Sequence, residues 1–588
     1  MAIDTTVGPA ESDAPHRALR VVPPWLRGYR REWLRPDVIA GVVVWSVVVP
    51  QAVAYAQIAG LPPQAGLMAA PGALVGYAVL GTSRTLVVGA TTATAALSAS
   101  AVGPLANGDT DRFIQLSAAL ALVTAAVLVC SGLLRLGAVA DLISKPVMTG
   151  FLFGLGLTIA VGQLPKLLGV DDPGGDFFPR LWGVLGEVGD IQPATAAVGG
   201  LSIVLLVVLR RVMPAVPGVL VVLVLSIVVS WLLDLKAHGV DVVGPLPSAL
   251  PDPSIPDLRD GDIATLIGTG FGVMFLSTEG IGVARGLATR EGYTVDASRE
   301  LVAFGGANLL SGLSQGFVQS GGASQTAAAD RAGGRTQLAS VVAAVLVLLT
   351  GAFLAPLFED LPQAALGAIV IVAVAGFWRV DELRRFARLR RSALVLSLTA
   401  LVGVLLLGVL PGLIVAAALS LVLVIRLLSR PPVGTLGRDP ATGVWGRLDR
   451  HPGAEPAAGV TVVRSDGPLF YANIVYVREW ILATAGAAGS RAVVIDLSTA
   501  GDLDVETLDT LAELADAGRR PAARLGPRAR PRGARAQRSG RPRRDRADDR
   551  RRRQRGWSAN TVAQSSFTLT TVQPSARAAS SACSAPPV

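Results

Sequence analysis

The sequence has few charged residues, and very few cysteines and histidines, for its length. Charged residues make up 16% of the 588 positions, whereas soluble domains average about 25%. The two cysteines, Cys130 and Cys583, stand in unrelated contexts, which excludes a disulfide framework. The three histidines show no metal-ligand spacing, so we expect no metal and no cofactor. A phosphate-binding loop motif is also lacking, so direct ATP driving is not supported and we expect no enzyme.

The chain contains many long apolar runs. Hydrophobic residues make up 51% of the chain, and a membrane-spanning helix needs about 20 mostly apolar residues. Counting the runs and the breaks inside them predicts an all-α polytopic membrane protein with fourteen spans. They lie near 37–57, 64–80, 86–103, 113–135, 139–168, 194–210, 214–234, 263–287, 297–314, 324–331, 336–357, 362–378, 392–409 and 411–428. The polar first 35 or so residues lack the apolar core of a signal peptide.

The loop charges predict how the spans are oriented. Arginines gather in the N-terminal segment and in the loops after the sixth, eighth and twelfth spans, whereas the loops on the other side contain mainly acidic residues. Because cytoplasmic loops carry the excess of Lys and Arg, we expect a multi-pass protein of the cell membrane with both termini in the cytoplasm.

A separate domain is expected after Arg430. The segments Gly459–Val463, Gly467–Tyr471 and Arg491–Leu497 have strand character, and Asp504–Ala517 has apolar residues at helical spacing. This predicts a small cytoplasmic α/β domain. The expected organisation is an N-terminal cytoplasmic segment (1–35), a transmembrane transporter domain (36–430), a partial α/β domain (431–518) and a tail (519–588).

The tail explains the net charge of +10. The stretch Arg519–Arg555 holds 17 arginines and three acids, and without it the chain sums to about −4. The basic charge therefore does not indicate a nucleic-acid partner. Two readings remain open. The tail is either a disordered basic segment near acidic lipid headgroups or the product of a reading frame lost near Arg519.

The first break in the apolar runs ends span one. Pro50 interrupts the helix, and Gln51 and Tyr55 follow it at membrane depth. Irregular backbone inside a membrane is tolerated only where it lines a cavity or is buried in protein. These residues are therefore candidates for substrate binding, with a kinked packing helix as the alternative.

Two further breaks lie in spans three and ten. Gly89, Ala90 and Thr91 precede a helix of small residues in span three. In span ten a glycine pair leads into a short helix that opens with Ala323, Ser324, Gln325 and Thr326, with Ser324 as the expected N-cap. For the break in span three the alternative is close helix packing through small residues. For the break in span ten the alternative is a plain re-entrant turn.

The separation of these breaks by seven spans predicts a 7+7 inverted repeat. Paired broken helices mark the substrate site of such transporters. Two half-helix N-termini that face each other would bind an anion through free N–H groups. We therefore expect a small anion as the substrate.

Glu279 lies well inside the eighth predicted span. An intramembrane carboxylate is costly and usually functional. Beside an anion it cannot remain charged cheaply, so we expect it to couple transport to protons. The alternative is an ion pair with Arg285.

Taken together, these segments resemble the SulP family of anion transporters, whose members carry a cytoplasmic STAS domain. The resemblance runs from about Trp25 to Ala517. It rests on Ile39–Gly41, Pro50–Ala56, Ala59–Pro63, Gly66–Leu67, Gly81–Arg84, Val88–Gly89, Glu279–Arg285, Asn308–Gly312, Gly334–Gln337, Gly467–Asn473 and Val494–Leu497.

The resemblance implies fourteen spans in a 7+7 fold, with a core domain that moves against a gate domain, and a homodimer. It implies sulfate, bicarbonate, chloride or dicarboxylate as cargo. It also implies a site formed by spans one, three, eight and ten. Gln51, Tyr55, Thr91, Glu279 and Ser324 inherit candidate roles from it.

The chain departs from the family pattern at several positions. Ala90 stands where a proline is frequent, and Gln325 stands where an arginine is frequent, so helix dipoles must attract the anion. Gly282 stands where sodium-coupled relatives carry an acid, which favours protons over sodium. The segment Asp502–Val505 lacks the hydroxyl residue of a STAS phospho-switch. Two other functions remain as alternatives: a nucleobase permease of the same fold, and a membrane-anchored regulator that acts through its STAS domain.

Overall fold

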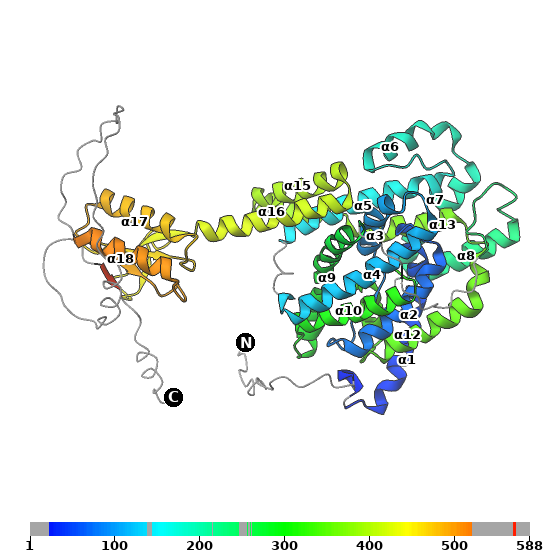
Figure 1. The fold of residues 1–588 in the computed structure, drawn as a ribbon, viewed down its shortest axis with the longest axis horizontal. Helices are drawn as coiled ribbons and strands as arrows, with labels where there is room; N and C mark the ends of the chain where they lie inside the picture. The colour runs from blue at the N-terminus through cyan, green and yellow to red at the C-terminus, as the bar shows by residue number, and fades with distance from the viewer. Residues whose placement is uncertain are drawn as a thin grey trace, which may run out of the picture. The chain divides into compact units, whose positions relative to one another are not determined.

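The computed structural model describes residues 23–26, 28–137, 144–213, 216–245, 256, 259, 261–519 and 569–571. The chain divides into two units, Met1–Leu421 and Val422–Val588 (Figure 1). The first holds the apolar helices and the second holds the α/β domain, and each is described by itself.

Each predicted span coincides with a helix in the described part of the chain. The helices are α1 (Leu34–Ile58), α2 (Pro63–Leu80), α3 (Thr92–Ala106), α4 (Thr110–Leu133), α5 (Lys145–Leu168), α7 (Pro193–Val212), α8 (Gly218–Leu233), α9 (Ile263–Glu291), α10 (Ala297–Leu313), α11 (Ala323–Arg331), α12 (Leu338–Leu349), α13 (Gln363–Val374), α15 (Arg391–Leu407) and α16 (Val409–Ser429). By length and composition, eight helical segments of the described residues could each cross a membrane, and α8 and α15 are shorter apolar helices. The number of crossings stays a prediction.

Two helices were not expected from the sequence. They are α6 (Phe177–Gly186) and α14 (Val380–Leu389). The helix α14 is amphipathic, because Glu382 and Phe386 are buried while its arginines are exposed. Its short length and high charge hid it among loop residues. Single-turn helices are η1 (Pro24–Leu26), η2 (Arg31–Trp33), η4 (Val188–Asp190), η5 (Thr350–Leu354), η6 (Ala355–Phe358) and η7 (Ala375–Phe377).

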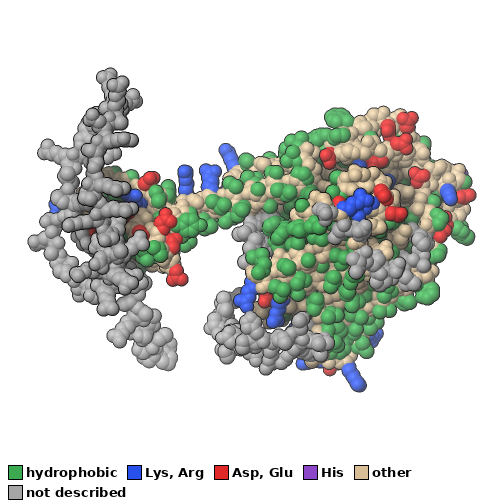
Figure 2. All heavy atoms as spheres, in the orientation of Figure 1, with side chains coloured by type: hydrophobic (Ala, Val, Ile, Leu, Met, Phe, Trp, Pro, Cys, Tyr) green, Lys and Arg blue, Asp and Glu red, His purple; other side chains and the backbone are tan. Residues whose placement is uncertain are grey.

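The helices of the first unit pack as two groups. In one group α10 packs on α2 and α4, α12 packs on α1 and α2, and α9 packs on α4; α4 and α10 lie side by side in Figure 1. In the other group α5 packs on α13 and α15, α7 packs on α13, and α14 packs on α15. Ala416 of α16 joins this group through a buried cluster with Val147 of α5 and Ala400 of α15. We call these groups the core and the gate. Many large apolar side chains remain exposed on their helices, and Figure 2 shows them over the sides of this unit, as expected for a surface that faces lipid.

The second unit contains a five-stranded sheet in the order β4-β3-β5-β6-β7. The strands are β3 (Val433–Arg438), β4 (Trp445–Arg447), β5 (Val460–Ser465), β6 (Ala492–Asp496) and β7 (Leu569–Thr571). The pairs β5–β6 and β6–β7 are parallel, whereas β3 pairs antiparallel with β4 and β5. Two helices, α17 (Ile474–Ala488) and α18 (Val505–Arg519), complete the described part of this unit.

Two of the three strands predicted for this unit, and its predicted helix, are present in the structure. The strands predicted in Gly459–Val463 and Arg491–Leu497 are β5 and β6, and the helix predicted at Asp504–Ala517 is α18. The strand expected in Gly467–Tyr471 is wrong, because this segment is a turn that enters α17, and Asn473 holds it through the carbonyl of Pro468. The tail contributes the short strand β7. Residues 520–568 and 572–588 lie outside the described part, so the two readings of the tail stay predictions.

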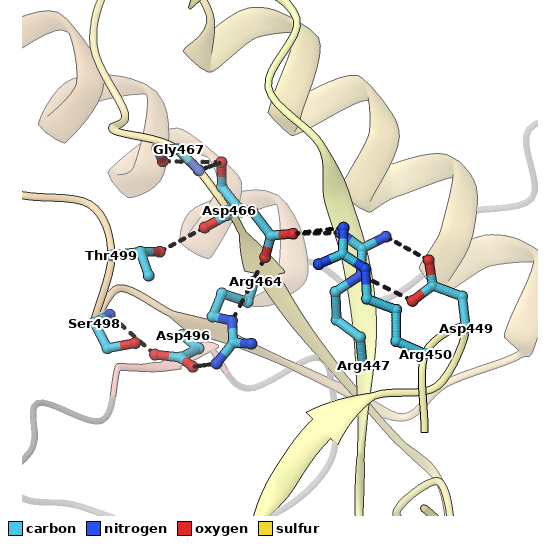
Figure 3. Close-up of polar contacts among 10 residues, drawn as sticks. Arg447, Asp449, Arg450, Arg464, Asp466, Gly467, Asp496, Ser498 and Thr499 are labelled. Atoms are coloured by element: carbon cyan, nitrogen blue, oxygen red, sulfur yellow. Dashed lines mark hydrogen bonds and ion pairs between the residues drawn. The ribbon is translucent and has the colours of Figure 1, made fainter. Parts of the chain in front are cut away.

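Charged side chains form a network where β5 and β6 end (Figure 3). Arg447 donates to Asp466 at 2.6 Å and to Asp449 at 2.7 Å. Arg464 lies 3.8 Å from Asp466 and 3.7 Å from Asp496. Because the carboxyl ends of parallel strands meet at one edge of a sheet, the two strand-terminal acids come together there, and the arginines compensate their charge.

Candidate functional site

The two broken segments meet in space. The strands β1 (Val88–Gly89) and β2 (Ser320–Gly321) pair antiparallel, with Val88 opposite Gly321 and Gly89 opposite Ser320. The backbone N–H of Gly322 donates to the carbonyl of Val87 at 2.9 Å. Since β1 leads into α3 and β2 leads into α11 within three residues, the antiparallel pairing brings the N-termini of the two half-helices together. We call this place the crossing.

The N-terminus of α3 is where the sequence predicted it. Thr91 has extended backbone and is the N-cap, and its hydroxyl oxygen accepts from the backbone N–H of Thr94 at 3.3 Å. Ala90 is buried and Thr91 is half-buried. A threonine N-cap satisfies one of the free N–H groups of a helix start and leaves others available to a ligand.

The N-terminus of α11 differs from the prediction. Its N-cap is Gly322 rather than Ser324, because Gly322 keeps an extended backbone and the helix starts at Ala323. Ser324 therefore lies inside the first turn, where its side chain is exposed together with Ala323. Thr326 is buried and links the two broken segments. Its hydroxyl accepts from the backbone N–H of Val87 and donates to the backbone carbonyl of Gly322.

A chain of amides joins the crossing to α1. Gln325 donates through Nε2 to Oε1 of Gln51 at 2.9 Å and to the carbonyl of Ala90 at 3.3 Å. Gln51 in turn donates to Oγ of Ser324 at 3.3 Å. Spans one, three and ten are thereby connected by neutral hydrogen bonds. Gln325 is 1% exposed, and its Oε1 is buried with no hydrogen-bond partner within the described residues.

Two glycines make room for that glutamine. A Cβ atom at Gly322 would lie 1.7 Å from Oε1 of Gln325, and one at Gly89 would lie 3.3 Å from the same amide. Tyr55 is buried on α1 and interacts with Thr92 at the start of α3. The structure thus assembles the predicted residues of spans one, three and ten. Among them Thr91 is half-buried, Ala323 and Ser324 are exposed, and the others are buried.

The helix α9 packs against the crossing through small residues. A Cβ at Gly280 would lie 2.8 Å from Cα of Gly321, so the two backbones touch. The hydroxyl of Ser320 donates to that of Ser277 at 3.4 Å. Glu279 precedes Gly280 on α9, about 100° around the helix from that contact, and its side chain is exposed. The guanidinium of Arg379, which precedes α14, interacts electrostatically with Glu279.

The sequence did not single out the residues that support β2. Asn308 on α10 accepts from the backbone N–H of Gln319 at 2.9 Å and donates to its carbonyl at 3.0 Å. The hydroxyl of Ser311 donates to the carbonyl of Phe317 at 2.7 Å. Asn308 therefore acts as a further strand partner for the segment that leads to the crossing. The motif Asn308–Gly312 was noticed only for its resemblance, and this geometry gives it a physical role.

Two buried carboxylates, Glu300 and Asp37, were also missed. Glu300 accepts from the hydroxyl of Tyr77 at 2.5 Å and from the N–H of Thr82 at 2.9 Å. Asp37 accepts from the backbone N–H groups of Arg335 and Thr336 at 2.6 and 3.0 Å. Each carboxylate thus holds a loop that flanks one broken span. The sequence contained an indirect signal for these two acids. The polar segments Gly81–Arg84 and Gly334–Gln337 stand between apolar runs, and their backbone N–H groups need hydrogen-bond acceptors if the segments are buried.

Comparison with family models matches the Sulfate permease family over residues 34–400 and the STAS domain over residues 451–525. The "Probable sulfate transporter" of Mycobacterium tuberculosis strain H37Rv is 36% identical over 491 residues, which cover 83% of this chain and 88% of that protein. Sulfate transporter 3.2 of Arabidopsis thaliana is 29% identical over 516 residues, which cover 83% and 80%.

Solved structures share the fold. The murine Solute Carrier 26 family member A9 anion transporter, in its inward-facing state, matches with a TM-score of 0.77 at 23% identity, over 86% of this chain and 89% of that one. The transmembrane domain of the cyanobacterial bicarbonate transporter BicA matches with a TM-score of 0.60 at 21% identity, over 68% and 100%. The chain belongs to the sulfate permease family of anion transporters and carries a C-terminal STAS domain.

Proposed function

We propose that this protein is a secondary active transporter that holds a small anion between the N-termini of α3 and α11. The observation that carries the proposal is the antiparallel pairing of β1 with β2, because it aims two positive helix ends at one place. The anion would accept from free N–H groups of both half-helices and from the exposed hydroxyl of Ser324. Gln51, Tyr55, Gly89, Ala90 and Gln325 would shape the wall behind it.

The nature of the side chains at the crossing supports an oxyanion as cargo. Gln51, Ser324 and Gln325 are neutral, so attraction comes from oriented dipoles rather than from a fixed cation. Such donors suit an anion that must bind and then leave again, because a buried ion pair costs several kcal/mol to break. Relatives named for sulfate and for bicarbonate indicate the class to test: sulfate, bicarbonate and small dicarboxylates.

The division into core and gate supports elevator-like alternating access. The crossing and Glu279 belong to the core, whereas Arg379 belongs to the gate. A movement of the core against the gate would carry the two half-helices and their anion as one body. The pairing of β1 with β2 joins the half-helices to each other, and the hydrogen bond from the N–H of Gln319 to Asn308 joins β2 to α10. We place the protein in the cell membrane as a homodimer with cytoplasmic termini.

Glu279 is our candidate for the coupling group. It precedes Gly280, which packs against Gly321 of the crossing, and we place its carboxylate near the bound anion. A carboxylate beside a bound anion is stabilised when it takes up a proton, and it repels the anion when it loses the proton. Proton binding and anion binding would therefore favour each other. Gly282, three positions further, offers no second acid for sodium.

Uptake into proteoliposomes tests the proposal. The purified full-length protein is reconstituted, and labelled sulfate, bicarbonate, succinate and uracil are supplied with and without an inward proton gradient. We expect uptake of at least one of the three anions, faster with the gradient, and none of uracil. Uptake of uracil alone would show a nucleobase permease, and absence of any uptake by protein that remains folded would favour a membrane-anchored regulator. Either result would overturn the proposal.

A further inference from the structure

An apolar groove runs between the core and the gate. It has a volume of about 360 Å³ and lies between α9 of the core and α16 of the gate. On α9 its wall is Gly268, Phe271, Gly272 and Phe275, and on α16 it is formed by leucine, isoleucine and alanine side chains from Leu410 to Leu421. All of these side chains are apolar or absent, so nothing in the groove would hold water or an ion.

The groove has a closed floor and an open side. A Cβ at Gly272 would lie 3.0 Å from Leu413 of α16 and 3.2 Å from Leu97 of α3, and both leucines are buried. Phe271 and Ile414 at the rim are 43% and 59% exposed. At Gly268 an added Cβ would meet no atom within 4 Å. The groove is therefore closed at Gly272 and open to the surroundings at Phe271 and Ile414.

Both helices that form the groove are long and apolar enough to cross a membrane. The medium at their outer surface is lipid, and the apolar, chain-shaped component of that medium is the acyl chain. An empty apolar groove loses the dispersion contacts of its lining atoms, and each methylene buried there contributes about 0.8 kcal/mol. We propose that this groove is a binding site for one acyl chain of a membrane phospholipid.

The position of the site connects it with transport. Gly268, Phe271, Gly272 and Phe275 recur at helical spacing on the face of α9 that continues to Glu279. The floor touches α3 through Leu97, and α3 is the half-helix that starts at the crossing. The two walls belong to the two bodies that would slide past each other. An acyl chain between them acts as a spacer, so its occupancy affects the rate of core movement; this consequence rests on the proposed function.

Photolabelling tests the binding site directly. The full-length protein is reconstituted with phosphatidylcholine that carries a diazirine near the middle of one acyl chain, irradiated, and mapped by peptide mass spectrometry. We expect labels to concentrate on 268–275 and 410–421. Gly268→Leu should lower labelling of 410–421 about tenfold, because its side chain displaces about two buried methylenes.

The matched control is Gly200→Leu on α7. Gly200 is also a helical glycine at which an added Cβ would meet no atom within 4 Å, but it lies outside the groove. This variant should leave labelling unchanged. Equal labelling of all lipid-facing helices, or equal effects of the two variants, would overturn the proposal. Protection of the groove in the dimer but not in the monomer would show that a second copy covers it, and would overturn it too.

Uptake by the same two variants separates this inference from the proposed function. Gly268→Leu should change the uptake rate while Gly200→Leu does not. If labelling behaves as expected and neither variant alters uptake, the lipid site stands and its link to transport fails. If no anion is taken up by the unmodified protein, the proposed function fails and the labelling result is unaffected.

Discussion

The crossing and the edge of the STAS sheet are both polar clusters, but they are built from different groups. At the crossing Gln51, Ser324 and Gln325 make neutral hydrogen bonds, and both glutamines are buried. At the sheet edge Arg447 and Asp466 belong to a network of full charges (Figure 3). The difference follows the surroundings, because an unpaired charge at membrane depth is expensive, whereas a charge at a wet surface costs little.

The two regions should differ in how strongly the loss of one charged side chain affects the protein. Glu279 stands out because it is an exposed acid within an apolar helix, next to the glycine that contacts the crossing. Asp449, by contrast, is one of several acids in a network where arginines already compensate it. A single charge in the first region is therefore expected to matter far more than a single charge in the second.

The largest effect is expected from Glu279→Gln. The change keeps the shape of the side chain and removes its proton equilibrium, so the acceleration of uptake by a proton gradient should be lost while the protein still folds. The measurement is initial uptake of the transported anion with and without the gradient. Glu291→Gln, at the exposed end of the same helix, serves as the control. Gradient-driven uptake by Glu279→Gln at the normal rate would rule out the coupling role.

A packing change at the crossing should come next. Gly280→Val inserts atoms where the backbones of α9 and β2 touch, and overpacking of this kind costs about 1–3 kcal/mol. Thermal unfolding in detergent should show a lower midpoint, and uptake should fall. Gly282→Val is the matched control, because an added Cβ there meets no atom within 4 Å. Equal midpoints for the two variants would contradict the close contact.

Removal of the neutral amide should have a smaller effect on folding. Gln325→Leu leaves Oε1 of Gln51 without its donor, which costs about 1–2 kcal/mol for a buried acceptor, and it should raise the anion concentration needed for half-maximal uptake. Gln163→Leu on α5 removes another buried glutamine, whose Oε1 has no partner among the described residues. If both variants raise that concentration equally, the amide chain has no special role at the site.

The charged network should tolerate the loss of one member. Arg447→Met removes the ion pairs with Asp449 and Asp466, and we expect a loss of about 1 kcal/mol, because Asp449 is exposed to water and Arg450 and Arg464 remain near Asp466. The difference from the unmodified domain should shrink further in 1 M NaCl, where the Debye length is about 3 Å. Denaturant unfolding of the full chain, followed by a probe in the STAS domain, measures it. Arg491→Met, at an exposed arginine, is the control.

The smallest effect is expected from the cap of α18. Asp504 accepts from the backbone N–H groups of Thr507 and Tyr471 at 2.8 and 2.7 Å. Hydrogen bonds from Thr507, and then from Tyr471, hold the pKa of Asp504 below its ordinary value. Because the folded pKa is lowered, the stabilisation is present above about pH 4 and is lost as the pH falls through the folded value. Asp504→Asn should reduce stability at pH 7 and reduce its loss in acid; equal pH profiles would contradict this.

Much of the helical architecture could be predicted from local patterns. The start of α3 was found because Thr91 follows a glycine-containing extended stretch. The N-cap of α11 was placed two residues too late, because Ser324 is a good cap by type, whereas Gly322 takes that role by its backbone conformation. The strand expected at Gly467–Tyr471 failed for a similar reason, since Asn473 turns this segment into a helix start.

The support around the crossing could not be predicted, because its partners are distant in sequence. Asp37 binds the loop at Thr336, and Glu300 binds the loop at Thr82. Each of these pairs joins residues more than two hundred positions apart. Periodicity and propensity describe neighbours along the chain and do not state which loop a buried acid will meet.

The sequence by itself determined that the chain crosses a membrane, where its helices break and that a small α/β domain follows, because hydropathy and backbone preferences are local properties. The tertiary structure alone decided that Val88 pairs with Gly321, that Gln325 donates to Gln51 and that Gly280 of α9 packs against Gly321. Those contacts depend on how the helices pack, and packing is settled only when the whole core is assembled.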